Sequence, residues 1–339
     1  YPLAIDPTWS LTVSMQAQHY FQTATRLQDG RVLVVGGLQD SCGCATSLAE
    51  IYNPKTMTWA RTLKPMGQPR YLHTATLLKN GEVLIAGAGY TPNPTTAEIY
   101  NPTNNSWRYT GNMHAPHIGG TAVLLQDGRV LISGGDDSIG HSDSTVEIYD
   151  PATGIWSLTS SPLVQDENHY ASITLLSNGK VLWSGAVHTY VDNNGHHLGP
   201  ADPEIYDPQT QVWTALPANG LHGGRGFLLN DGRVIFTSGE IYNPANNSVV
   251  QLPYQSNQGP TRLGNTLLSD GRLMITGSDS TVTSAVLIYD PYKNATYSAP
   301  SMSYARSSHT ATLLNNGMVL VAGGLGTANS AELYNPSGV

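Results

Sequence analysis

The stretch TATRLQDGRVLVVGG (residues 23–37) contains the unit from which most of the chain is built. Two short apolar runs flank an Asp-Gly pair, and two glycines end the second run. Runs of about five residues rich in Val and Thr, joined by Asn-Gly or Asp-Gly, form hairpins of antiparallel strands. The stretch therefore predicts a β-hairpin whose turn lies at Gly30.

The same hairpin recurs along the sequence. Its turn glycines are Gly30, Gly81, Gly128, Gly179, Gly232, Gly271 and Gly317, with a mean spacing of about 48 residues. A third run such as AEIYNP (residues 49–54) and a fourth run, which in most units carries Trp, complete each unit. Because no segment shows a sustained helical period, the sequence predicts seven four-stranded antiparallel units.

An aromatic pair fixes the register of the third and fourth runs. The pairs stand seven residues apart at Tyr52 and Trp59, Tyr100 and Trp107, Tyr149 and Trp156, and Tyr206 and Trp213. One large aromatic side chain per strand can pack between neighbouring sheets. We therefore expect these pairs to have a structural role.

Four-stranded units with paired glycines after the second strand, followed by Tyr and Trp, resemble the kelch repeat. The wording HTATLLNNGMVLVAGG (309–324) and AELYNP (331–336) is similar to that of bacterial kelch proteins. The resemblance runs from Met15 to Pro336 and implies an all-β fold, a seven-bladed β-propeller of four-stranded antiparallel blades. It says little about function, because one such scaffold hosts many activities.

The two ends of the chain complement each other. The last unit stops at AELYNPSGV (331–339) with three strands and no Trp, whereas the opening DPTWSLTVSM (6–15) supplies Trp9 with no unit before it. An unclosed ring would leave exposed strand edges. We expect residues 1–14 to close the last blade within a single domain, 1–339, whose blades start near residues 15, 66, 113, 162, 219, 258 and 302.

Composition excludes some classes of partner. Charged residues make up 12% of the chain and the net charge is −8, so no basic stripe exists for nucleic acid. No apolar stretch approaches the roughly 20 residues that span a bilayer. A chain whose polarity comes from Gly, Thr, Ser, Asn and Tyr is typical of exported proteins, and we expect a secreted or extracellular protein whose leader has been removed.

The two cysteines lie together in DSCGCATS (residues 40–47). Cys42 and Cys44 could form a small disulfide, bind a soft metal or remain free thiols. We favour the disulfide, with a small effect on stability because the closed loop is short.

The kelch resemblance implies that a ligand binds over the central channel. That face is built by the segments that enter each innermost strand and by the loops between second and third strands. Nine to eleven residues before the turn glycines, His, Arg and Tyr are frequent. We expect these side chains to bind the ligand at the channel mouth: His19, Tyr20, Arg70, Tyr71, His117, His169, Tyr170, His222, Arg262 and Arg306.

Two further features refine this expectation. His73 and His309, inside HTATLL, are expected to be buried structural residues. The loop of the fourth blade is the longest, and long loops are often functional. We expect it to add ligand contacts from His188, Tyr190, His196 and His197.

The predicted ring is poor in carboxylates, which argues against a glycosidase with paired acids. It suits a glycan or another polar or anionic ligand, because Arg binds carboxylates and Tyr stacks on sugars. A lyase that performs β-elimination on an acidic polysaccharide with His, Tyr and Arg is an alternative. A protein partner, or a structural protein with contacts between propellers, is a further alternative.

Residues 19–44 also look like a blade of the galactose oxidase family, in which a Tyr-His pair binds copper. Tyr20 matches the tyrosine, but Phe21 replaces the histidine, and no cysteine stands where the family crosslinks one to a second ligand tyrosine. We therefore predict neither a metal nor another cofactor.

Overall fold

The computed structural model describes residues 7–39, 42–89, 91–137, 141, 143–163, 172–184, 190–191, 197–198, 203–217, 221, 224–237, 239–252, 264–277, 282–326 and 329–337. At 190–191 and 197–198 the description covers the backbone alone. All regular elements within these ranges are β-strands, and no helix long and apolar enough to cross a membrane occurs there.

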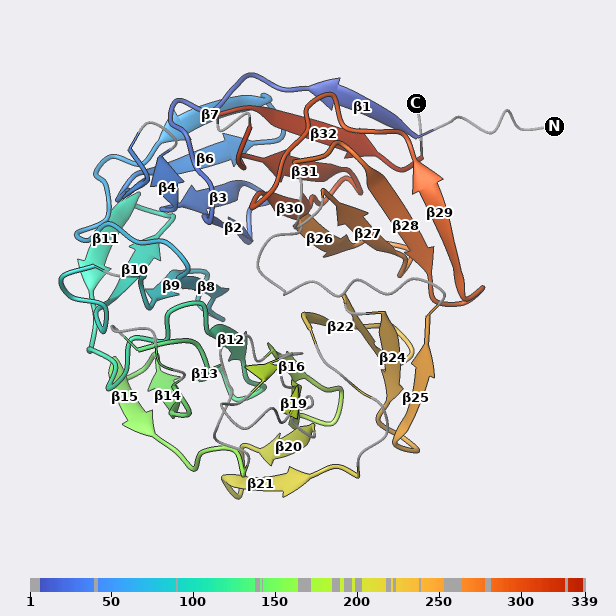
Figure 1. The fold of residues 1–339 in the computed structure, drawn as a ribbon. Helices are drawn as coiled ribbons and strands as arrows, with labels where there is room; N and C mark the ends of the chain where they lie inside the picture. Colours follow the sequence, from blue (N-terminus) through green and yellow to red (C-terminus); the bar gives the residue numbers. More distant parts are fainter. Residues whose placement is uncertain are drawn as a thin grey trace.

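Seven four-stranded antiparallel sheets surround a central axis (Figure 1). Blade one consists of β2 (Thr23–Arg26), β3 (Val32–Val35), β6 (Ala49–Asn53) and β7 (Thr58–Arg61). Blade two consists of β8 (Thr74–Leu77), β9 (Val83–Ala86), β10 (Ala97–Asn101) and β11 (Ser106–Tyr109). Blade three consists of β12 (Thr121–Leu124), β13 (Val130–Ser133), β14 (Val146–Asp150) and β15 (Ile155–Leu158).

The remaining blades follow the same order. Blade four consists of β16 (Ser172–Leu175), β17 (Val181–Ser184), β20 (Glu204–Asp207) and β21 (Val212–Ala215). Blade five consists of β22 (Gly226–Leu228), β23 (Val234–Phe236), β24 (Glu240–Asn243) and β25 (Ser248–Gln251). Blade six consists of β26 (Gly264–Leu267), β27 (Leu273–Thr276), β28 (Val286–Asp290) and β29 (Ala295–Ala299). Blade seven consists of β30 (Thr310–Leu313), β31 (Val319–Ala322), β32 (Ala331–Asn335) and β1 (Thr8–Leu11).

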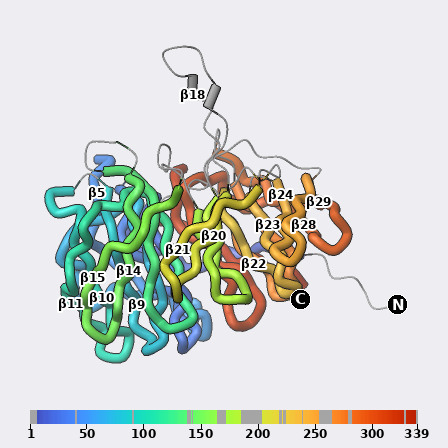
Figure 2. Tube along the Cα trace, turned by 90° about the horizontal axis from the view of Figure 1, so that it is seen from below, coloured from blue at the N-terminus to red at the C-terminus, as the bar shows by residue number. Residues whose placement is uncertain are grey.

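Two small ribbons lie in the loops between second and third strands. They are β4 (Leu38–Gln39) with β5 (Cys44–Ala45) in blade one, and β18 (Tyr190–Val191) with β19 (His197–Leu198) in blade four. Viewed from the side, the molecule is a ring that is wider than it is tall, with β15 and β21 on the near side (Figure 2).

The N-terminal strand closes the ring. Strand β1 pairs with β32 so that Trp9 stands opposite Tyr334, and the two ring centroids are 5.0 Å apart. The four other Tyr-Trp pairs have centroid distances of 4.8 to 5.0 Å. Trp9 thus takes the place of the tryptophan that the last unit lacks, and the predicted fold and its closure are confirmed.

The hydrophobic core lies between the blades. The buried apolar side chains of the described residues form seven clusters, each drawn from two neighbouring blades. In one of them Val32 and Tyr52 of blade one pack with Leu320 of blade seven. Each blade therefore needs both neighbours to bury its two faces, which explains why ring closure matters for stability.

Glycine is required at two positions of the hairpin. All seven turn glycines have φ between 82° and 98°, a left-handed conformation that costs glycine little. After the second strand, a Cβ on Gly36 would collide with the carbonyl oxygen of Arg70 in the next blade. A glycine directly after the second strand thus allows the segment that enters the next blade to approach closely.

Candidate functional site

Four of the predicted ligand-binding side chains are not at the channel mouth. His19, Arg70, His117 and Arg306 are fully buried, each with 0% of its surface exposed. They occupy the same position, eleven residues before the turn glycine, in blades one, two, three and seven. Because these four side chains are buried, they do not face a ligand as we expected. Each is buried because it contacts a buried carboxylate within its own blade.

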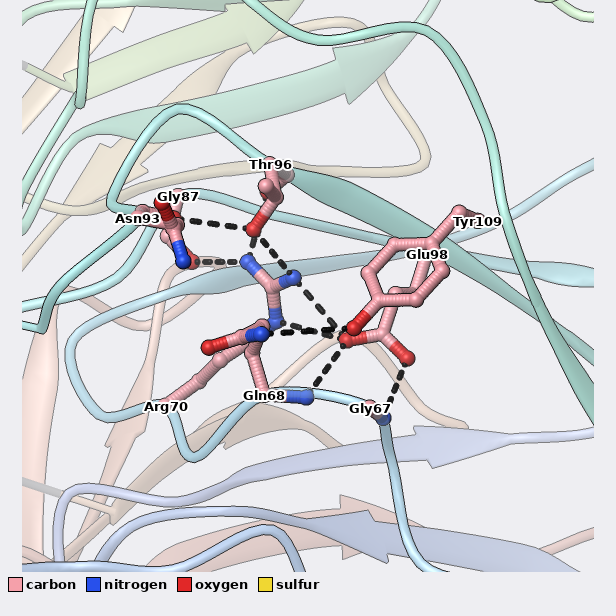
Figure 3. A network of polar contacts seen from close by, with 8 residues as sticks. All are labelled: Gly67, Gln68, Arg70, Gly87, Asn93, Thr96, Glu98 and Tyr109. Atoms are coloured by element: carbon pink, nitrogen blue, oxygen red, sulfur yellow. Dashed lines mark hydrogen bonds and ion pairs between the residues drawn. The ribbon is translucent and has the colours of Figure 1, made fainter.

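Arg70 shows the arrangement in detail (Figure 3). Its guanidinium donates to Glu98 Oε1 at 3.0 Å and to the carbonyl oxygens of Gly87 and Thr96 at 3.1 and 2.6 Å. Glu98 also accepts hydrogen bonds from the N–H groups of Gly67 and Gln68. The ion pair therefore joins the segment entering blade two to its second and third strands.

The other three blades repeat this pair. His19 Nε2 lies 3.4 Å from Glu50 Oε1, and His117 Nε2 lies 3.3 Å from Glu147 Oε1. Arg306 Nη2 donates to Glu332 Oε1 at 2.7 Å. In each case the same side chain also contacts the carbonyl of the glycine after the second strand. A cationic or donor residue is needed here because two buried acceptors must be satisfied.

Burial and hydrogen bonding oppose each other at these carboxylates. Desolvation would raise the pKa of Glu50, but contact with His19 and the N–H groups of Gln16 and Ala17 outweigh it, so the pKa lies below its usual value. The pKa of Glu147 is lowered for the same reasons. Burial lowers the pKa of Arg70 and Arg306, which remain charged because the guanidinium pKa is so high.

The sequence carried a signal for these pairs that our prediction missed. The glutamate stands two residues before the third-strand tyrosine, as in AEIYNP, in every unit but the sixth. There Leu287 replaces the glutamate, and Pro260 stands at the position that His or Arg occupies in blades one, two, three and seven. Counting the glutamates together with the cations would have indicated internal ion pairs.

The two described tyrosines of the predicted set are half-buried at the ring. Tyr20 packs against Phe21, with ring centroids 5.5 Å apart. The ring of Tyr71 fills the space beside Gly89, where a Cβ would collide with it. His169, Tyr170, His222, Arg262, His188 and His196 lie outside the described residues, as do the side chains of Tyr190 and His197. Ligand binding by these residues stays a prediction.

His73 and His309 have the structural role expected from the sequence. His73 Nε2 lies 2.9 Å from Thr23 Oγ1 of blade one, and His309 Nε2 lies 2.7 Å from Thr276 Oγ1 of blade six. Burial, helped by the charges of Arg70 and Arg306, lowers the pKa of each histidine to about 3. Both rings are therefore neutral and link adjacent blades.

The central channel contains a cavity of about 450 Å³ that all seven blades line. Its wall comes from the innermost strands and the residues just before them, such as Phe21, Leu72 and Gly119. Hydroxyl groups stand at one level of the wall, on Thr23, Thr74, Thr121, Ser172 and Thr310. A cavity of this size and polarity can hold a small polar ligand.

Arg225 interrupts that level in blade five. Its side chain is exposed to the channel, and its guanidinium carbon lies 5.2 Å from the centre of the Phe227 ring. Surrounding protein atoms lower its pKa by hindering hydration of the charge, yet the group stays protonated. Among the described residues no carboxylate neutralises Arg225, in contrast to Arg70 and Arg306.

A second cavity, of about 500 Å³, lies on the turn side between blades one and two. Its charged groups are already paired, because Arg31 binds Asp29 and Arg108 binds Glu82. Although it is slightly larger, this cavity offers a ligand no unpaired charge. We therefore assign the candidate site to the central channel.

Cys42 and Cys44 are joined by a disulfide, with their Cα atoms 5.1 Å apart. At the position of the copper-binding pair, Tyr20 stands beside Phe21, which offers no ligand atom. The residues that the structure describes contain no group of three or more His, Cys, Asp or Glu side chains placed to hold a metal ion. The residues at this position do not fit the copper site of the galactose oxidase family.

Comparison with known proteins supports the repeat assignment. Residues 118–163 match the kelch motif. Kelch-like protein 21 of Homo sapiens is 31% identical over 118 residues, which are 34% of this chain and 19% of that protein. Kelch-like protein 15 of Danio rerio is 25% identical over 214 residues, 59% of this chain and 35% of that protein. The chain thus spans about a fifth to a third of these relatives.

A copper-containing fungal alcohol oxidase of the AA5 family has a similar structure, with a TM-score of 0.74. The superposition covers 97% of this chain and 76% of that one, at 15% sequence identity, so it speaks for the fold alone. The motif match, the kelch-like relatives and the similar structure all agree with a closed ring of seven blades. The chain is a seven-bladed β-propeller that contains a kelch motif at residues 118–163.

Proposed function

We propose that this propeller is a secreted binding module that holds a glycan or another polar or anionic ligand in its central channel. The observation that carries the proposal is the cavity of about 450 Å³, which all seven blades line and into which Arg225 brings a cation that no described carboxylate neutralises. Arg70 and Arg306 are paired with glutamates inside the blades, whereas Arg225, at a different position of the repeat, faces the channel without a described carboxylate partner.

The binding function is favoured over lyase chemistry. A lyase would use His, Tyr and Arg side chains at the ring, but His19, Arg70, His117 and Arg306 are already engaged with glutamates. The disulfide between Cys42 and Cys44 supports export, because disulfides persist mainly in oxidising compartments.

Filling the channel tests this function. Ala122 lines the cavity from β12, and Ala122→Phe places a ring in the ligand's space. We expect binding to an array of neutral and acidic oligosaccharides to weaken about tenfold or more, equivalent to roughly 1.4 kcal/mol. Ala60→Phe makes the same change on the exposed outer strand β7 and serves as the control.

Thermal unfolding of both variants verifies that they retain the fold. Binding that is equal in Ala122→Phe and in the unmodified protein would remove the channel as the site. Failure of every oligosaccharide to bind the unmodified protein would contradict the glycan proposal itself.

A further inference from the structure

The ring of innermost strands is not uniform. Neighbouring innermost strands pack closely around the channel, but this close packing is lost between β22 of blade five and β26 of blade six. The spacing between these two strands is visible in Figure 1. Arg225 and Phe227 reach the cavity from the blade-five side of this junction, and Asn265 does so from the blade-six side.

The guanidinium of Arg225 is placed so that it can bind a ligand. Its guanidinium carbon lies over the Phe227 ring, and no described residue accepts a hydrogen bond from its N–H groups, which are thus available to a ligand. Its backbone N–H donates to Thr237 Oγ1, which fixes the chain at the start of β22. A stacked guanidinium with a free edge binds a carboxylate through two parallel hydrogen bonds.

Asn265 gives an independent indication of a ligand. Its side chain is 3% exposed and lines the cavity, yet neither Nδ2 nor Oδ1 has a hydrogen-bond partner among the residues that the structure describes. A buried amide without partners costs about 1 to 3 kcal/mol, so such groups are normally satisfied. A side-chain amide both donates and accepts hydrogen bonds, and a ligand hydroxyl group can serve as the partner in either direction.

We infer that the junction of blades five and six is a subsite for a sugar acid, whose carboxylate binds Arg225 and whose ring hydroxyls bind Asn265. The inference rests on the proposed function and names the chemical class of its ligand. The dianionic phosphate group of a phosphate monoester would satisfy Arg225, but that group offers Asn265 no donor. The oxygen of Thr310 in the adjacent blade seven, which donates its own proton to Ala322, remains an acceptor for a further ring hydroxyl.

Calorimetric titration with D-glucuronate and with D-glucose tests the inference. We expect the intact protein to bind glucuronate at least tenfold more tightly than glucose, the range for a hydrogen bond to a charged group. Arg225→Gln should abolish this preference. Asn265→Leu, which has a similar shape without polar atoms, should weaken both sugars and leave the preference in place.

Arg233→Gln is the matched control, because Arg233 belongs to the same blade but pairs with Asp231 at the turn. Equal affinities for the two sugars, or a glucuronate affinity unchanged in Arg225→Gln, would overturn the inference. If Ala122→Phe still weakened an oligosaccharide in that event, the channel function would stand without the sugar-acid subsite. Tighter binding of a glutamate-containing tetrapeptide than of glucuronate would also overturn it.

Discussion

Arg70 and Arg225 are two arginines of the same ring with opposite surroundings. Arg70 is fully buried, 3.0 Å from Glu98, and bonded to two carbonyl groups. Arg225 is exposed to the channel, stacks on Phe227 and has no carboxylate partner among the described residues. Residue type therefore does not distinguish a structural arginine from a candidate binding residue here, whereas the presence of an internal acid does.

The difference follows from the position of each residue in the repeat. Arg70 stands where the chain enters a blade, a position at which the backbone carbonyl accepts from Gly37 of the preceding blade. Its side chain is directed to its own third strand. Arg225 stands four residues further along the unit, directly before the innermost strand, where the other blades have small side chains such as Thr23 and Thr74.

Among the predicted changes, removal of the acid beside Arg70 should lower the free energy of unfolding most. Glu98→Leu leaves a buried charge without a partner, and we expect the free energy of unfolding to fall by about 3 to 5 kcal/mol. The double variant Arg70→Met with Glu98→Leu should be more stable than Glu98→Leu alone, because no buried charge remains. Urea denaturation measures both.

Blade six, with Leu287 at the glutamate position, shows that an uncharged version of the unit occurs in this chain. Asp231→Ala breaks the exposed pair with Arg233 and is the control, for which we expect less than about 1 kcal/mol. If the double variant is as unstable as Glu98→Leu alone, the loss of stability comes from the N–H groups of Gly67 and Gln68, which lose their acceptor, and not from the unpaired charge of Arg70.

The second prediction uses the histidine beside Arg70. The pKa of His73 is lowered to about 3 by burial and by the charge of Arg70, whereas free histidine titrates near 6.5. Below pH 6.5 the unfolded chain binds a proton that the folded chain does not, so stability is present above this pH and is lost as pH falls toward 3. Between pH 7 and 5 we expect a loss of about 2 kcal/mol from this residue.

His73→Gln should remove that pH dependence. Gln22 occupies the same position in blade one and donates to Ala322 of the adjacent blade, so glutamine is compatible with the fold. Unfolding measured at pH 7 and pH 5 gives the slope, and His309→Gln beside Arg306 is a parallel case. An identical slope in His73→Gln and the unmodified protein would show that His73 is not the group that titrates.

The sequence predicted the fold more fully than the site, and the pair of Arg70 and Glu98 shows why. Hairpins, turn glycines and aromatic register are local patterns, and they led to seven blades and to the closing role of Trp9. The direction of a side chain depends on contacts across the blade. His19 and Arg70 seemed available because their glutamates stand about 30 residues away in the sequence.

The sequence prediction did not include Arg225, for a different reason. It stands outside the level at which His, Arg and Tyr recur, in the unit GGRGFLLNDG (residues 223–232), and nothing local marks it. The spacing between β22 and β26 and the unpaired amide of Asn265 emerge only when the ring is assembled. In a repeat protein, an unusual residue is therefore found by comparing equivalent positions of all repeats, and not by inspecting its neighbours in the sequence.

The smallest effect on stability should come from Arg225 itself. Because the side chain is exposed and pairs with no described carboxylate, Arg225→Ala should change the free energy of unfolding by less than about 0.5 kcal/mol. Arg70→Ala, measured in the same urea titration, should cost several times more, since it leaves Glu98 buried without its cation. Comparable losses in the two variants would mean that Arg225 contributes to the fold as Arg70 does, and the contrast between a structural and a ligand-directed arginine would fail.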